Sequence, residues 1–172
     1  MSNNQKSEAD LAYERELRIY FFKAFVYEFS KIIIFLCFAA FFNIVKEYLV
    51  ALLFLMLVRT SGGGLHLRTY IGCLIVSFIF LYSSIFLAWI CKPHQVVMAI
   101  ILAFCALIGR YLVPITSDNR PEASIELVRN SKRNTFIIII SMSILICICP
   151  LNIYSYICFW TVVLHILQLI IA

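Results

Sequence analysis

Charged side chains are scarce in this sequence. Asp, Glu, Lys and Arg make up 13% of its 172 residues, whereas about one quarter of a soluble globular domain is charged. Hydrophobic residues make up 63%, and the mean hydropathy is +0.98. This composition excludes a soluble domain and predicts an integral membrane protein.

Several sequence signatures are missing as well. The charged segment before the first apolar run, which begins near Phe29, has neither the short basic region nor the A-x-A site of a cleaved secretory signal peptide. We therefore expect the first apolar run to remain in the mature protein. The chain also has no Walker motif, no H-E-x-x-H and no second pair of metal ligands, so we expect no metal, no other cofactor and no nucleic-acid partner.

The seven cysteines do not predict a disulfide scaffold. Cysteine inside an apolar run behaves as a small hydrophobe. Five cysteines lie in such runs and are expected to be packed: Cys37, Cys105, Cys147, Cys149 and Cys158. Cys73 and Cys91 lie near polar flanks, and only Cys73 has a histidine at a useful spacing on the same side.

Six apolar runs predict an all-α polytopic membrane protein with about six transmembrane helices. The runs cover residues 29–45, 48–58, 71–90, 95–115, 135–149 and 151–171. A full span needs about 20 apolar residues, so the short second run also fits half of a re-entrant pair with the run before it. Because both segments of such a pair would be removed together, the side assigned to later segments does not change.

Residues 1–28 are expected to form a cytoplasmic or interfacial segment ahead of one multispan domain, residues 29–172. Apolar and aromatic residues recur at spacings of three and four between Tyr13 and Tyr27, with charged residues between them. This pattern predicts an amphipathic helix over residues 7–28. Two alternatives stay open: the helix lies along the inner membrane interface before it turns in, or it is a plain helical lead-in to the first span.

Basic residues gather on one predicted side of the membrane, with Lys31 at the inner boundary and only Lys46 and Lys92 on the other side. Cytoplasmic loops carry the excess of Lys and Arg, so the N-terminus is expected inside the cell. The basic residues assigned to this side are Lys6, Arg15, Arg18, Lys23, Arg59, Arg68, Arg110, Arg120, Arg129, Lys132 and Arg133.

The loop over residues 59–73 contains the candidate catalytic residues. Three consecutive glycines, 62–64, are followed by His66, and Cys73 stands seven residues beyond that histidine. Histidine accepts a thiol proton near neutral pH, and the resulting thiolate is a strong nucleophile. The pair predicts acyl transfer on a peptide at the cytoplasmic interface. The glycines permit positive φ and close backbone approach; a flexible interhelical turn is the alternative.

On a continuous helix the side chains of His66 and Cys73 would be about 10 Å apart, too far for direct proton transfer. We therefore expect a break or a helix start between them, for which Gly72 is a candidate. With Cys73 in the first turn of the next helix, the helix dipole, Arg59 and Arg68 would favour the thiolate, and free backbone amides would stabilise an oxyanion. The alternatives are an interfacial histidine and a packed thiol.

No carboxylate is placed by the sequence where it would orient His66, so a Cys–His dyad is favoured over a triad. The other two histidines do not compete for the role of base. His94 falls on the opposite side of the membrane. His165 lies within the last apolar run, where it is expected to be packed or hydrogen-bonded.

The motif Arg59-x-x-Gly62-Gly63-Gly64-x-His66, with Cys73 seven residues beyond, resembles the AgrB (accessory gene regulator B) family of membrane endopeptidases that make cyclic autoinducer peptides. The chain length, the six apolar runs and the basic first segment are similar to that family too. A second, weaker resemblance runs from Val113-Pro114-Ile115 to Asn119-Arg120-Pro121.

The resemblance implies that Cys73 is the nucleophile and His66 the base, and that Arg59 and Gly64 match positions that the family requires. The implied substrate is an AgrD-like propeptide with an amphipathic leader, a central segment with an internal Cys or Ser, and an acidic C-terminal tail. Cys73 would form a thioester by attacking the bond before the tail. The internal thiol or hydroxyl of the substrate would then displace the enzyme and close a thiolactone or lactone ring for quorum sensing. The implied location is the bacterial cell membrane.

Positive charge near the entrance would attract an acidic tail. The loop over residues 116–134 and its flanks supply this charge, although the ordinary cytoplasmic excess of basic residues explains the same pattern. The residues expected to contact the tail are Arg68, Arg110, Arg120, Arg129, Lys132 and Arg133.

Two functions of other classes compete with the peptidase. One is a non-catalytic membrane interaction protein, such as an accessory subunit of a transporter or sensor, in which the glycines form only a tight helix connection. The other is a small transporter subunit, although only Arg110 approaches the intramembrane charges that usually line a transport path. Contact with membrane lipid is expected, and a homodimer stays open.

Overall fold

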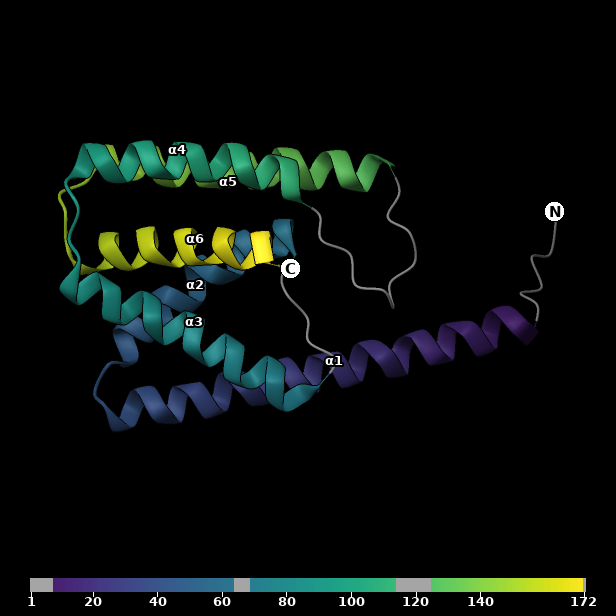
Figure 1. The fold of residues 1–172 in the computed structure, drawn as a ribbon. Helices are drawn as coiled ribbons and strands as arrows, with labels where there is room; N and C mark the ends of the chain where they lie inside the picture. The colour runs from purple at the N-terminus through teal and green to yellow at the C-terminus, as the bar shows by residue number, and fades with distance from the viewer. Residues whose placement is uncertain (1–7, 64–68, 114–124, 172) are drawn as a thin grey trace.

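The computed structural model describes residues 8–63, 69–113 and 125–171, and this part of the chain consists of helices without strands. The predicted all-α class is confirmed. Most of the helices match the predicted apolar runs. The first and the fifth begin much earlier, and residues 125–134, which were expected in the loop over residues 116–134, are helical. The helices are α1 (Glu8–Phe41), α2 (Val45–Gly62), α3 (Tyr70–Ile90), α4 (Gln95–Leu112), α5 (Ile125–Ile148) and α6 (Ile153–Ile171) (Figure 1).

Helix α1 runs without a break through residue 28. Its 34 residues correspond to about 51 Å, well beyond the roughly 30 Å of a bilayer's hydrocarbon core. The N-terminal half of α1 accordingly projects past the other helices (Figure 1). The structure shows one continuous helix here, and both alternatives for residues 7–28, the position along the inner interface and the plain lead-in, remain predictions.

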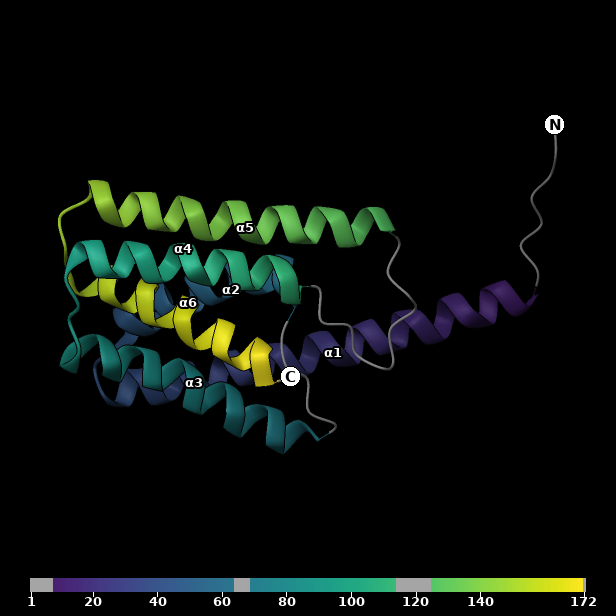
Figure 2. The ribbon, with the colours of Figure 1, turned by 45° about the horizontal axis from the view of Figure 1, so that its top comes forward.

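The helices run back and forth between two ends of a bundle. The short α1–α2, α3–α4 and α5–α6 connections lie at one end, while α2 and α4 finish and α3 and α5 begin at the other, as both views show (Figures 1 and 2). We call this second end the basic end, because a group of arginines and lysines lies there: Arg59, Arg110, Arg129, Lys132 and Arg133. Lys46 and Lys92 lie toward the opposite end, in agreement with the predicted segregation of charge.

Four segments have the length and composition to cross a membrane: α3, α4, residues 128–148 of α5, and α6. Helices α1 and α2 pair antiparallel through a tight turn in which Asn43 adopts a φ of 57°. Asn and Gly are the residues that tolerate this left-handed conformation best. The chain is thus a polytopic membrane protein, whose first two helices form a hairpin beside the four membrane-crossing segments.

Helix α6 is the centre of the bundle. It packs against α2, α3 and α4, and its buried face includes Phe159, Val162 and Ile166. One cluster of buried side chains joins α6 to α4, α5 and the end of α2. A second cluster, around Tyr48 and Ile85, joins α1, α2 and α3 to the start of α6.

The prediction of packed cysteines is correct for Cys105 and Cys158, which are buried, and wrong for Cys37, Cys147 and Cys149, which are exposed on the outside of the bundle. An apolar run in a membrane has an outer face that contacts lipid, so an apolar environment does not require packing against protein. The sequence pattern does not distinguish these two faces.

Gly109 lets α4 approach its neighbours closely. A Cβ atom added there would lie 3.1 Å from Cδ1 of Ile166 and 3.4 Å from Cγ2 of Thr135. Small residues at such crossings bring membrane helices into van der Waals contact.

We predict that Gly109→Leu separates α4 from α5 and α6 and lowers the stability of the bundle by roughly 1–3 kcal/mol, the usual effect of overpacking. The measurement is the thermal unfolding midpoint of the purified protein in detergent. Phe104→Leu, at a position on the same helix that is 62% exposed, is the matched control and should leave the midpoint nearly unchanged. Equal midpoints for the two variants would contradict the packing role of Gly109.

Candidate active site

Helix α3 begins between the two predicted catalytic residues. Thr69 has an extended backbone and caps the helix, its Oγ1 accepting a hydrogen bond from the Gly72 amide at 3.3 Å. The amide of Cys73 donates to the Thr69 carbonyl at 3.1 Å. The expected helix start is confirmed, but it lies at Tyr70 rather than at Gly72. Because the amide of Cys73 is already bonded, only amides earlier in the first turn are left for an oxyanion.

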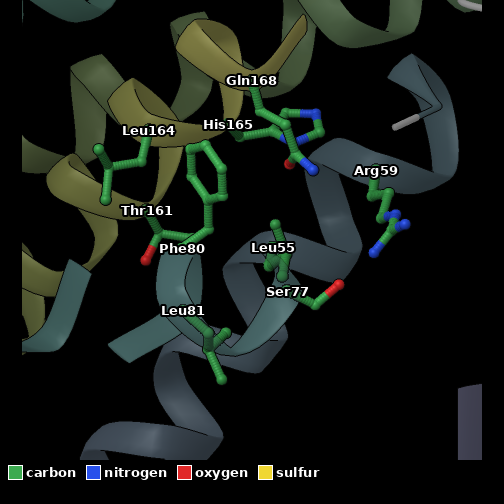
Figure 3. Close-up of a pocket in the computed structure, with 9 residues that line it drawn as sticks. All are labelled: Leu55, Arg59, Ser77, Phe80, Leu81, Thr161, Leu164, His165 and Gln168. Atoms are coloured by element: carbon green, nitrogen blue, oxygen red, sulfur yellow. The ribbon is translucent and has the colours of Figure 1, made fainter. Parts of the chain in front are cut away.

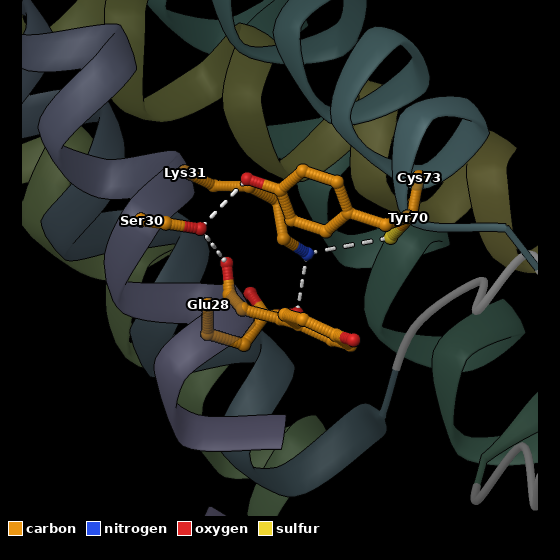
Figure 4. Close-up of polar contacts among 6 residues, drawn as sticks. Glu28, Ser30, Lys31, Tyr70 and Cys73 are labelled. Carbon is orange, nitrogen blue, oxygen red and sulfur yellow. Dashed lines mark hydrogen bonds and ion pairs between the residues drawn. The ribbon is translucent and has the colours of Figure 1, made fainter. Parts of the chain in front are cut away.

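Cys73 is buried, with 8% of its surface exposed, and its sulfur faces α1. The Lys31 ammonium donates to Sγ of Cys73 at 3.4 Å and also forms an ion pair with Oε1 of Glu28 at 2.5 Å. Lys31 is itself only 4% exposed. Figure 4 shows Glu28 of α1 and the thiol of Cys73 on α3 around the nitrogen of Lys31.

A second set of polar contacts fixes the start of α3 against α1. A hydrogen bond of 2.7 Å joins Oγ of Ser30 to the phenol oxygen of Tyr70, and Ser30 also donates to the Tyr27 carbonyl (Figure 4). The rings of Tyr27 and Tyr70 lie against each other, with centroids 5.1 Å apart. These contacts hold Cys73 in register with Lys31, so α1 forms the wall that covers the thiol.

The contact with Lys31 places an ammonium beside the sulfur of Cys73. A positive charge within about 4 Å of a thiol stabilises its anion, and the surrounding apolar helices strengthen the interaction. Glu28 offsets part of this effect because it shares the same ammonium.

Sequence reasoning placed Lys31 only at a membrane boundary and gave it no role. The available signal is the pair Glu28 and Lys31, three residues apart on one helix face inside an otherwise apolar stretch. That pair predicts a buried ion pair. It does not tell which other residue the ammonium would meet, because Cys73 lies 42 residues further along the chain.

Several predicted site residues lie outside the described part of the chain, so the predicted dyad geometry is not among the observations. They are Gly64, His66, Arg68 and Arg120. The other two glycines of the motif are described. Gly63 has a φ of 76° and donates to the Arg59 carbonyl at 2.9 Å, a backbone conformation essentially restricted to glycine. The expected positive φ is therefore confirmed at Gly63, where α2 ends.

Gly62, at the end of α2, is packed against neighbouring segments of the bundle. It is buried, and a Cβ atom added there would lie 3.4 Å from Cγ2 of Val113 and 3.6 Å from Nε2 of His165. Arg59, one turn earlier on α2, extends to a small cavity that His165 also lines. The end of α2 is thus packed against α6 near this histidine.

Comparison with known proteins gives one result. The family model of Accessory gene regulator B matches residues 1–169, almost the whole chain. The chain belongs to the AgrB family. No curated protein and no solved structure matches it. Membership in the AgrB family implies a role in the maturation of quorum-sensing peptides and an AgrD-like propeptide as partner.

The AgrB fold separates Cys73 from the described residues that were expected to contact an acidic tail. Arg110 lies on α4, with its guanidinium 5.6 Å from the centroid of the Phe136 ring on α5. Arg129, Lys132 and Arg133 lie on the first half of α5. Helices α5 and α3 lie on opposite sides of α6 in both views (Figures 1 and 2). These basic residues share the basic end with Cys73 but do not surround it.

We predict that Lys31→Met lowers the rate at which iodoacetamide alkylates Cys73 at pH 7 by about tenfold, because removal of the ammonium leaves less thiolate. Mass spectrometry of the individual cysteine peptides measures the rate. Exposed Cys91, at the other end of α3, is the internal reference.

Lys46→Met removes a lysine from the opposite end of the bundle and should not change the ratio of the two rates. Lys31→Arg keeps the charge and should retain most of the reactivity of Cys73. An unchanged or higher ratio in Lys31→Met would show that Lys31 does not activate the thiol.

Proposed function

We propose that this AgrB-family protein is a membrane cysteine endopeptidase that removes the acidic C-terminal tail of an AgrD-like propeptide and closes the remaining peptide into a ring. The observation that carries the proposal is the thiol of Cys73, buried near the start of α3 beside the ammonium of Lys31. A cysteine with only a packing role needs no cation at its sulfur.

In the first half of the proposed reaction, His66 takes the proton of Cys73, and the thiolate attacks the carbonyl carbon of the peptide bond before the tail. The tetrahedral intermediate collapses when the tail's nitrogen leaves with the proton from His66. The products are the free tail and a thioester between the propeptide and Cys73. Lys31 stabilises the thiolate before the attack.

In the second half, the internal thiol or hydroxyl of the propeptide gives its proton to His66 and attacks the thioester carbon. The bond to Cys73 breaks, the ring closes, and the thiolate of Cys73 is regenerated beside Lys31. Exchange of one thioester for another is nearly isoenergetic, so hydrolysis has to be suppressed for the ring to accumulate. Burial of Cys73 behind α1 keeps water from the thioester.

The basic end is proposed to face the cytoplasm, because cytoplasmic segments carry the excess of Lys and Arg. Arg129, Lys132 and Arg133 then attract the acidic tail from a distance rather than by contact at the scissile bond, since α5 is separated from α3 by α6. Their effect should fall on the association rate and should weaken as salt concentration rises.

We predict that membranes carrying the wild-type protein release the tail from an AgrD-like propeptide, and that Cys73→Ala abolishes the release. His66→Ala should slow it by about 100-fold or more, the usual range for loss of a general base. Mass spectrometry of the peptide products measures both effects. Cys91→Ala, which removes a thiol from the other end of α3, is the matched control and should cleave normally.

Tail release that is equally fast in wild type and in Cys73→Ala would contradict the peptidase proposal and favour a non-catalytic membrane interaction protein. Normal cleavage in His66→Ala, together with complete loss in Cys73→Ala, would assign the proton transfer to another group.

A further inference from the structure

A group of buried polar atoms lies between α2, α5 and α6. Nη2 of Arg59, Oγ1 of Thr135 and both ring nitrogens of His165 are buried and have no hydrogen-bond partner among the described residues. His165 is 2% exposed and Thr135 is fully buried. Buried polar atoms without partners are rare in native proteins, and in an apolar bundle each one is costly. This group therefore points to a ligand.

A small cavity is lined by both Arg59 and His165, whereas Thr135 is not among its lining residues. Its volume is about 20 Å³, and its walls come from α2, α3 and α6. Figure 3 shows Arg59 extending from α2 and His165 and Gln168 from α6 around the same space. The hydroxyls of Ser77 and Thr161 complete the polar lining, and the remaining walls are leucine and phenylalanine. A cavity of this size accepts a small terminal group and nothing larger.

The charge of the lining selects the kind of group. A guanidinium is positively charged at every physiological pH and only donates hydrogen bonds. No acidic side chain lies among the residues that line the cavity. The imidazole, the amide of Gln168 and the Ser77 hydroxyl supply further donors, whereas the Thr161 hydroxyl already donates to Oγ of Ser84 at 3.1 Å. A carboxylate matches this set, because its oxygens accept from several donors at once and its charge balances that of Arg59. A water molecule would satisfy the hydrogen bonds but not the charge.

The cavity lies next to the nucleophile along α3. Ser77, which lines it, follows Cys73 by four residues, so the two side chains share one helix face about 6 Å apart along the axis. An extended peptide advances about 3.3 Å per residue. A peptide whose scissile bond lies at Cys73 would reach the cavity with a group one or two residues away.

We propose that Arg59, His165 and Gln168 form a subsite that binds a carboxylate of the peptide substrate close to the scissile bond. This inference rests on the proposed function. The carboxylate comes either from an acidic side chain or from the C-terminus of the peptide.

The test is a coupling measurement between protein and peptide. The AgrD-like propeptide is prepared with each Asp changed to Asn and each Glu to Gln, one at a time, and in a separate form with an amidated C-terminus. In the wild type, one of these changes should lower kcat/KM for tail release by about tenfold more than the others. In Arg59→Gln the same change should have almost no further effect, because its partner is already gone.

Lys46→Gln is the control, since it removes a positive charge from the opposite end of the bundle, away from the cavity. It should leave the difference between the peptides intact. The amidated peptide separates the two sources: sensitivity to amidation assigns the C-terminal carboxylate, and sensitivity to one Asn or Gln change assigns a side chain. If all carboxylate changes have the same effect in wild type as in Arg59→Gln, the subsite is disproved.

Two additions cover the case in which Arg59→Gln does not fold or the propeptide is not cleaved. Arg59→Lys and His165→Gln retain polar groups in the bundle and replace Arg59→Gln if that variant does not fold. Binding of the same peptides to Cys73→Ala, measured by fluorescence anisotropy, needs no turnover. If the carboxylate change and the Arg59 substitution are coupled in binding but the wild type does not cleave the propeptide, the subsite is supported and the peptidase is disproved. If the wild type cleaves the propeptide but the two changes are not coupled in either assay, the peptidase is supported and the subsite is disproved.

Discussion

The described site depends on one contact, the approach of the Lys31 ammonium to the sulfur of Cys73. A charged lysine inside an apolar bundle is stable only with an anion beside it. Glu28 supplies one carboxylate from the same helix, and the thiol lies on the other side. The long first helix, the cap at Thr69 and the hydrogen bond between Ser30 and Tyr70 all act to keep these two side chains together.

This contact explains why the first helix belongs to the functional site rather than preceding it. Helix α1 is continuous through residue 28, so the position of its outer half is transmitted directly to Lys31. It also closes the thiol off from the outside of the bundle. A buried nucleophile suits a reaction in which a thioester must survive long enough to meet a second thiol rather than water.

Much of the fold could be predicted from the sequence, because it depends on local patterns. Apolar runs gave the positions of most helices, and the run of glycines predicted the positive φ found at Gly63. The partners of individual polar side chains could not be predicted in this way. Lys31 contacts Cys73, and Arg59 and His165 line one cavity, only because α1, α2, α3 and α6 pack as they do. His165 was expected to be packed or hydrogen-bonded, and it is packed with both nitrogens free of partners in the described chain.

Helix α3 takes part both in the contact between Lys31 and Cys73 and in the cavity lined by Arg59 and His165. Helix α3 presents Cys73 to α1 and, one turn later, presents Ser77 to the cavity between α2 and α6. The basic residues of α4 and α5 lie farther away, beyond α6. In this account distant charge gathers the substrate, the cavity sets its position, and the thiol beside Lys31 performs the chemistry.

The central claim is that Cys73 becomes acylated. The most direct test is intact-mass spectrometry of the purified protein, quenched in acid shortly after mixing with an AgrD-like propeptide. The account predicts an added mass equal to the propeptide without its tail, located on the peptide that contains Cys73 and removed by hydroxylamine, which cleaves thioesters. Tail release with no such adduct at any time, or an adduct on another residue, would contradict it.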